Sequence, residues 1–299
     1  KNATERLAND MKDTGMVTAA VWTDLDGDGK NDLFVTTDWD SPKIYRNNGR
    51  KLAKWNTGLD SLKGWWNTVT AADLDGDGDQ DLILGNDGSN MHYRPKPGSP
   101  MKMWVNDFDN NGTLEQIITV QENGKDYPIH MKKELTGQLV SLKKENLRAS
   151  VYAKRTIQEL LPPEVVANSI VKQVNISESV LLINEGEWKF RVQILPERVQ
   201  LSCICGIACM DVNNDGHLDL VMGGNKHEFK PQFSRLDAGY GNVLLGDGNL
   251  GFQWQQYDQS GFFVRGEVKY IKPIRDRNGK TYLVVALNED QPRIFKLDE

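Results

Sequence analysis

The chain contains four short loops in which oxygen-bearing side chains alternate along the sequence. Each loop has nine residues, with Asp, Asn or Glu at positions one, three, five and nine and glycine at position six. Such a turn can direct alternate oxygens inward, and the glycine lets the backbone close the ring. Calcium takes about 6 to 8 oxygen ligands in flexible geometry. Four loops are therefore predicted calcium sites: Asp24–Asp32 (DLDGDGKND), Asp73–Asp81 (DLDGDGDQD), Asp107–Glu115 (DFDNNGTLE) and Asp211–Asp219 (DVNNDGHLD).

The predicted ligands follow from position within each loop. Side chains at positions one, three, five and nine supply oxygens, and the residue at position seven supplies its main-chain carbonyl. About four calcium ions are expected, one in each loop. The ligands are Asp24, Asp26, Asp28, Lys30 and Asp32; Asp73, Asp75, Asp77, Asp79 and Asp81; Asp107, Asp109, Asn111, Thr113 and Glu115; and Asp211, Asn213, Asp215, His217 and Asp219.

The flanking sequences predict strands, whereas an EF-hand loop would need helices on both sides. A short β-type segment precedes each loop: Val17–Thr23, Thr68–Ala72, Met101–Asn106 and Ile204–Met210. A continuous apolar run follows each loop, as in Leu82-Ile83-Leu84, which is typical of a strand buried on both faces. Further hairpin turns are indicated at Asn47-Asn48-Gly49, Glu185-Gly186-Glu187 and Asp247-Gly248-Asn249. Two hairpins in a repeat predict a four-stranded sheet.

Repeated small sheets in an all-β chain favour radial stacking. The predicted fold is therefore a β-propeller of four-stranded blades, with a calcium loop between strands one and two of each blade, plus a small helical insertion. Three phrases carry a family resemblance: GMVTAAVWTDLDGDGKNDL (15–33), GWWNTVTAADLDGDGDQDLILGN (64–86) and GIACMDVNNDGHLDLVMGGN (206–225). They resemble the FG-GAP or VCBS repeats of integrin-α-type propellers, and are most similar to the bacterial secreted, cartilage-acidic-protein-like group. The resemblance extends along most of the chain but says almost nothing about a ligand.

The number of blades leaves two alternatives open. A fifth, degenerate repeat at residues 268–287 has Asp276 and Asn278 at positions three and five but lacks oxygens at positions one and nine, so a blade without metal is expected. About five units then occupy residues 1–299, whereas the resemblance implies seven blades. The chain is either the C-terminal part of a longer propeller or a closed five-bladed one.

Residues 122–179 are predicted to form an insertion inside the third blade. Between Lys132 and Leu161 glycines are sparse and apolar residues recur at helical spacing, until Pro162-Pro163 ends the pattern. This segment is locally basic. Two interpretations stay open: the solvated face of a helix packed on the propeller, or an arm that docks a partner.

Charge and composition limit the partners and the compartment. The net charge of −6 argues against nucleic acid and an anionic membrane surface, and no apolar run approaches the roughly 18 residues that membrane insertion requires. Loops of this kind suit compartments with about millimolar calcium, so a secreted, cell-surface or periplasmic location is expected. Cys203, Cys205 and Cys209 match no zinc spacing, and buried strand thiols are favoured.

The favoured function is a calcium-stabilised binding or adhesion module for an extracellular protein or carbohydrate. The sequence shows no nucleophile paired with a base, no open metal site and no phosphate loop, so an enzyme is not expected. Two alternatives stay open because fold does not fix function: a polysaccharide-acting lyase or hydrolase on a propeller scaffold, and a purely structural module of a larger surface protein.

Ligand-binding residues are expected on the connections between second and third strands, at Thr37–Pro42, Asn86–Pro100 and Gly224–Leu236. Long loops on a rigid scaffold are where binding function concentrates. The residues are Trp39, His92, Tyr93, Arg94, His227 and Phe229. The competing interpretation for Trp39 and Trp65-Trp66 is that packing between blades buries their rings.

Overall fold

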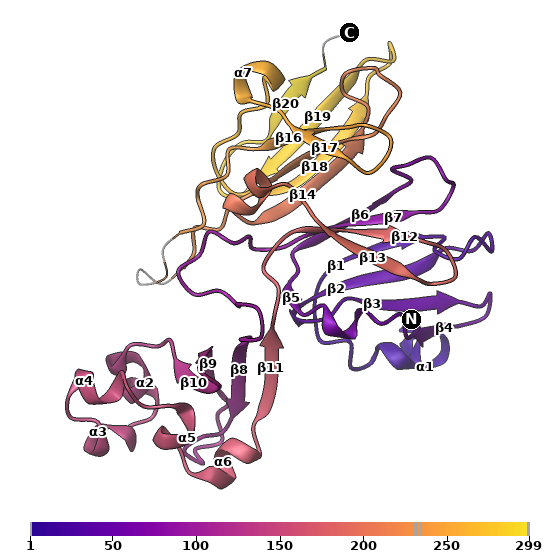
Figure 1. Ribbon diagram of the computed structural model, residues 1–299. Helices are drawn as coiled ribbons and strands as arrows, with labels where there is room; N and C mark the ends of the chain where they lie inside the picture. Colours follow the sequence, from indigo (N-terminus) through magenta and orange to yellow (C-terminus); the bar gives the residue numbers. More distant parts are fainter. Residues whose placement is uncertain (1, 230–232, 234, 298–299) are drawn as a thin grey trace. The chain divides into compact units, whose positions relative to one another are not determined.

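The computed structural model describes residues 2–229, 233 and 235–297 (Figure 1). The chain divides into two compact units. Unit 1 comprises Lys1–His92 and Ser177–Glu299, and unit 2 comprises Tyr93–Ile176. Antiparallel sheets form the framework of both units, which confirms a mainly all-β protein, and most of the helices lie in unit 2. No helix within the described ranges is both long enough and apolar enough to span a membrane.

Unit 1 contains four antiparallel sheets whose strands follow chain order. Sheet one consists of β1 (Met16–Thr23), β2 (Asp32–Asp40), β3 (Lys43–Asn47) and β4 (Leu52–Trp55), and β5 (Gly64–Trp65) also pairs with β2. Sheet two consists of β6 (Thr68–Ala72), β7 (Asp81–Gly85), β12 (Val180–Asn184) and β13 (Phe190–Ile194). Sheet three consists of β14 (Ile204–Met210), β15 (Asp219–Gly224), β16 (Asn242–Gly246) and β17 (Phe252–Trp254). Sheet four consists of β18 (Val268–Arg275), β19 (Thr281–Leu287) and β20 (Arg293–Lys296).

Short helical turns connect and cover these sheets. They are α1 (Thr4–Leu7), η1 (Asn9–Met11), η2 (Leu59–Ser61), η3 (Glu197–Leu201) and α7 (Tyr257–Ser260). Met11 of η1 packs against Leu33 and Tyr45 on one face of sheet one.

The four sheets of unit 1 stack in a row, as Figure 1 shows. β1 packs against β6, β6 against β14, and β14 against β18, so the first strands of the sheets are neighbours. Ile83 and Ile207 belong to the core between sheets two and three, and Val221 and Val268 belong to the core between sheets three and four. These contacts support blade-like stacking, and a closed propeller is not shown by them.

Glycine allows the sheets to approach closely at the ends of the second strands. A Cβ atom added to Gly85 at the end of β7 would lie 2.3 Å from the carbonyl oxygen of Ile204, which begins β14. Any side chain at this position would force sheets two and three apart, since real Cβ atoms do not approach backbone oxygen so closely.

The strands that flank the loops agree closely with the sequence pattern. The predicted first strands match β6 and β14 residue for residue, and β1 begins one residue earlier than predicted, at Met16. Every residue of β7, β12 and β15 is buried. Continuous apolar runs therefore mark strands covered on both faces, as expected.

Unit 2 is inserted in the connection between β7 and β12 of sheet two. Its sheet has the order β10 (Lys125–Pro128), β9 (Glu115–Glu122), β8 (Met101–Asn106) and β11 (Ile170–Val174). Its helices are α2 (Lys132–Gln138), α3 (Leu142–Glu145), α4 (Ala149–Tyr152), α5 (Ile157–Leu160) and α6 (Pro163–Ala167). Leu135, Leu139 and Leu160 pack with Trp104 and Ile117 in one core.

This organisation differs from the predicted insertion at residues 122–179 inside a third blade. The loop Asp107–Glu115 itself lies in unit 2, and β11 pairs with β8 instead of following the chain order of a blade. The difference arises because the inserted unit begins with a copy of the strand–loop–strand motif that marks the blades. In addition, Pro163 begins α6 and does not end the helical region, since proline is well tolerated in the first turn of a helix.

Candidate metal centres

All four predicted loops curl around the side chain at position one. Its Oδ2 accepts the N–H of the position-six glycine: Asp24 from Gly29 (2.7 Å), Asp73 from Gly78 (3.1 Å), Asp107 from Gly112 (2.8 Å) and Asp211 from Gly216 (2.9 Å). These four glycines have φ between 81° and 95°, in the left-handed region where side chains are strained. The sixth position therefore requires glycine for its backbone conformation.

Carboxylate oxygens converge in three of the loops. In each cluster, one oxygen from every member lies within 4.8 Å of the others: Asp24, Asp26 and Asp28; Asp73, Asp75 and Asp77; Asp107, Asp109 and Glu115. In the fourth loop Asn213 stands at position three, and its Oδ1 accepts the N–H of Asp215 at 3.2 Å. Clusters composed only of oxygen donors fit a hard cation such as calcium, so the residues suit the predicted ion.

The residue at position nine ties the loop to its sheet. Asp32, Asp81 and Asp219 have exposed fractions of 1%, 2% and 0%. Each accepts two backbone N–H groups, one from loop position two and one from the end of the third strand. The pairs are Leu25 (3.2 Å) and Asn47 (2.7 Å), Leu74 (3.2 Å) and Asn184 (2.9 Å), and Val212 (2.7 Å) and Gly246 (2.8 Å). Sequence reasoning assigned these carboxylates only to the metal and missed this second role.

Burial changes the protonation of the position-nine carboxyls. It raises the pKa of Asp81 to about 6, although the backbone N–H groups of Asn184 and Leu74 oppose the rise. Burial likewise raises the pKa of Asp32 and of Asp219. A cation bound in the loop would favour the charged carboxylate and act against this effect.

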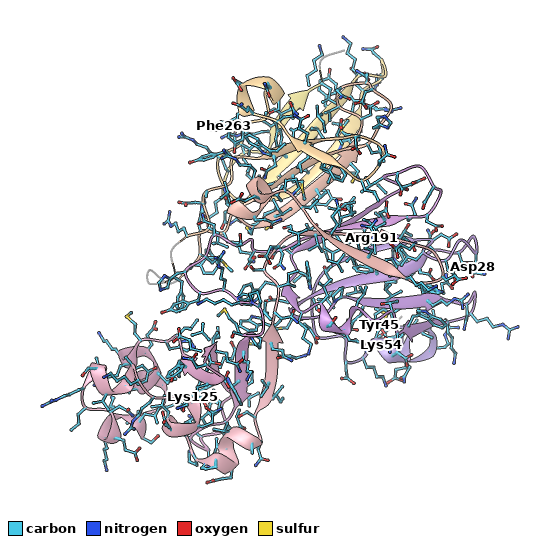
Figure 2. The ribbon with its side chains drawn as sticks, in the orientation of Figure 1. Asp28, Tyr45, Lys54, Lys125, Arg191 and Phe263 are labelled. Carbon is cyan, nitrogen blue, oxygen red and sulfur yellow. The ribbon has the colours of Figure 1, made fainter. Side chains whose placement is uncertain are left out.

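The first loop lies beside two basic side chains. Lys30 Nζ is 2.8 Å from Asp28 Oδ2, and Arg46 Nη2 is 2.7 Å from Asp26 Oδ2. Figure 2 labels Asp28 at the rim of unit 1. The Arg46 guanidinium also lies 5.2 Å from the ring centroid of Trp55 and 5.6 Å from that of Trp188. Part of the negative charge of this loop is thus already compensated.

The second loop lacks such compensation and is close to the first. Among the described residues, none of its carboxylates forms an ion pair with a basic side chain. Burial, and then the carboxylates of both loops, raise the pKa of Asp79. Asn184 joins the two loops, because its N–H donates to Asp81 and its Nδ2 donates to the carbonyl of Leu25 at 3.0 Å.

Trp39 does not offer an exposed ring to a ligand. It lies on β2, with φ at 56°, and only 9% of it is exposed. Its ring packs edge-on against Trp65, with centroids 5.5 Å apart, and Trp66 is fully buried. Packing within sheet one, between β2 and β5, thus covers the Trp39 ring and leaves little of its surface for the ligand-binding role predicted for it.

The other predicted ligand residues are divided between the two units. His92 is the last residue of the first segment of unit 1, whereas Tyr93 and Arg94 begin unit 2. In unit 1, the N–H of His227 donates to Glu267, and the N–H of Phe229 donates to the carbonyl of His227 at 2.9 Å. Residues 230–232 and 234 of the predicted loop Gly224–Leu236 lie outside the described residues.

A polar cluster that the sequence did not predict forms where the second strands of three sheets end. Lys226 pairs with Asp87, which also accepts Nδ2–H of Asn67 at 2.9 Å. Burial raises the pKa of Asp38 to about 6, and Lys226 acts in the opposite direction. Lys226 lies more than a hundred residues along the chain from Asp87, so no local pattern could have revealed the pair. Beside them, the thiols of Cys203 and Cys205 are 3.6 Å apart and not disulfide-bonded.

Comparison with known proteins gives one family match. Residues 24–84 match the family model of the FG-GAP-like repeat. This segment thus carries an FG-GAP-like repeat. It runs from the first loop through sheet one and the second loop into β7. No curated protein matches the chain.

The solved structures similar to this chain include the crystal structure of the V. cholerae biofilm matrix protein Bap1. The identity is 9%, the TM-score is 0.29, and the match covers 94% of this chain and 62% of that chain. The chain thus matches less than two thirds of that structure's length. With so low a TM-score, the likeness carries no argument about fold or function.

Proposed function

We propose that the protein is a calcium-stabilised extracellular binding or adhesion module with no catalytic site of its own. The observation that carries this proposal is the convergence of oxygen donors in loops that join the first and second strands of stacked sheets. The FG-GAP-like repeat supports the same reading. Its partner is an extracellular protein or a carbohydrate.

Electrostatics explains why the ions would stabilise the fold. The second loop holds five aspartates without an ion-pair partner among the described residues, and the first loop is its neighbour. Like charges at such short range repel each other and oppose the compact state. A divalent cation in each loop removes this repulsion, so the free energy of cation binding adds to the stability of the folded state.

The loops suit a structural role better than a chemical one. Their position-one and position-nine carboxylates accept backbone N–H groups, which holds these oxygens in place within the loop. Low-affinity calcium loops of this type function where calcium is about millimolar, which is why we place the protein outside the cell.

Calcium removal tests the stabilising role. Melting the intact chain in calcium, in magnesium and in chelator should give the highest melting temperature in calcium. Each site contributes about 2.7 kcal/mol when calcium is at a hundredfold excess over its dissociation constant. Magnesium should substitute poorly, because it demands near-octahedral geometry at about 2.0–2.1 Å. Superimposable melting curves in calcium and chelator would refute the proposal, and turnover of any member of a polysaccharide panel would refute the absence of catalysis.

A further inference from the structure

Unit 1 carries a partly exposed group of aromatic rings next to two arginines, which we name the aromatic–arginine cluster. The rings of Tyr240 and Phe263 stack with centroids 5.2 Å apart at an interplanar angle of 8°. The ring of Tyr257 contacts those of Phe263 and Trp254 edge-on, at 5.5 Å in each case. The members of the cluster are Tyr240, Trp254, Tyr257, Phe263, Arg198 and Arg265.

The backbone holds the cluster in a fixed position. Along residues 262–265, Phe262 and Val264 are buried, whereas Phe263 and Arg265 are exposed. Phe262 packs against Phe295 with ring centroids 4.9 Å apart, and the N–H of Val264 donates to the carbonyl of Tyr240 at 2.9 Å. The core residues thus anchor the segment, and their neighbours are presented outward on one side.

The aromatic side chains are exposed enough to contact a ligand. They are also held in place, so they lose little conformational entropy when the ligand binds. Phe263 is 42% exposed and lies at the periphery of unit 1 in Figure 2. Trp254 is half-buried, and its Nε1–H donates to Asn242 Oδ1 at 3.0 Å, so its polar atom is already satisfied. Rings held in place before binding lower the entropic cost of forming a complex.

The arginines give the cluster its charge preference. The guanidinium carbon of Arg198 lies 5.2 Å from the Trp254 ring centroid, and that of Arg265 lies 5.7 Å from the Phe263 ring centroid. Both arginines are exposed, and within the described residues neither forms an ion pair, even though the chain has a net charge of −6. Their planar N–H groups are therefore available for bidentate bonds to an anionic group.

We propose that the aromatic–arginine cluster is the binding site for an acidic polysaccharide, which deepens the proposed binding function and rests on it. The apolar faces of sugar rings would pack on Phe263 and its neighbouring rings. The uronate carboxylates would accept N–H bonds from Arg198 and Arg265. A neutral glycan could bind to the rings alone, so the presence of two arginines favours a polysaccharide that carries a negative charge on its sugar units.

Short oligouronates, too short to gel with calcium, are the probe, and neutral malto-oligosaccharides of equal length are the reference. Binding to the intact chain in calcium is measured by calorimetry. The double variant Arg198→Gln/Arg265→Gln should bind the oligouronate about tenfold or more weakly, and Phe263→Ala should weaken it several-fold. The matched control is Arg191→Gln/Arg293→Gln, which removes two exposed arginines that pair with Glu185 and Asp290, and it should bind as the parent does.

Equal affinity of the cluster and control variants would overturn the inference. So would equal affinity for the neutral oligosaccharide, or binding to anionic phospholipid vesicles in preference to the oligouronate. Melting curves of the same samples separate this inference from the proposed function. If calcium raises the melting temperature but no oligouronate binds, only the polysaccharide site fails. If calcium has no effect, the proposed function fails independently of the sugar result.

Discussion

The loop Asp73–Asp81 in unit 1 and the loop Asp107–Glu115 in unit 2 share one spacing but are closed differently. Asp81 is buried and accepts N–H groups from both Leu74 and Asn184. Glu115 accepts the N–H of Phe108 at 3.0 Å, and its carboxylate also lies in the cluster formed by Asp107 and Asp109. The longer glutamate side chain reaches the cluster that the aspartate does not join.

This difference shows that one sequence motif supports two kinds of attachment. In the stacked sheets, position nine connects the start of the loop with the end of the third strand, so the loop belongs to the sheet before any cation binds. In unit 2 the corresponding carboxylate makes a local bond within the loop, and Phe108 packs with Trp104 and Tyr152 in the helical core. Removing the position-nine carboxylate should therefore destabilise unit 1 even in the absence of calcium.

The largest expected effect is the loss of folding stability caused by Asp81→Ala in the metal-free protein. Truncation leaves two buried backbone N–H groups without an acceptor, and each such loss costs about 1 to 3 kcal/mol. Glu115→Ala removes one acceptor and should cost about half as much. Hydrogen–deuterium exchange in chelator can follow the two units separately, and the amides of Leu74 and Asn184 should lose protection in Asp81→Ala.

Asp75→Ala is the matched control, because it removes a carboxylate of the same loop that belongs to the acidic cluster. In chelator it should be neutral or slightly stabilising, since it relieves repulsion. If Asp81→Ala and Asp75→Ala had the same stability in chelator, the position-nine carboxylate would act only as a metal ligand. The two loops would then not differ in how they are attached.

Local patterns predicted the loops and their flanking strands because each depends on a few adjacent residues. Gly78 needs a left-handed backbone, and the run Leu82-Ile83-Leu84 needs burial on both faces. The order of the sheets could not be predicted in the same way. β7 pairs with β12 across a connection of more than ninety residues, and unit 2 carries its own copy of the motif, so the third motif does not mark a sheet of unit 1. Similarly, Trp39 looked like a loop residue because nothing local reveals its packing against Trp65.

A smaller effect is expected when the stability of unit 1 is measured as a function of pH. The pKa of Asp81 is raised from 3.8 to about 6 by burial, so the folded state holds its proton more tightly than the unfolded state. Metal-free protein should gain stability as pH falls from 8 towards 4, and this contribution is lost as pH rises through about 6. The gain should be about 1 kcal/mol once solvent screening is allowed for.

Urea unfolding at several pH values, in the absence of metal, measures this effect. Asp81→Asn should flatten the profile, whereas Asp60→Asn, at an exposed carboxyl in η2, should leave it as in the parent. An Asp81→Asn profile with the full slope of the parent would show that the buried carboxyl stays ionised. The raised pKa of Asp81 would then no longer distinguish the loop Asp73–Asp81 from the loop Asp107–Glu115.

The smallest expected effect compares the first loop with the second. Arg46 lies 2.7 Å from Asp26 and contacts the rings of Trp55 and Trp188, so it neutralises a carboxylate that calcium needs. Arg46→Gln should strengthen calcium binding in the first loop by about three- to tenfold, since a partly exposed ion pair contributes about 1 kcal/mol. Terbium luminescence, excited through the tryptophans in an Asp77→Ala background that weakens the second loop, reports on the first. Arg191→Gln, at the position labelled in Figure 2, removes an arginine paired with Glu185 and should leave the affinity unchanged. Weaker terbium binding in Arg46→Gln would mean that the arginine orders the loop for the ion, and the two neighbouring loops would then differ in preorganisation and not in charge.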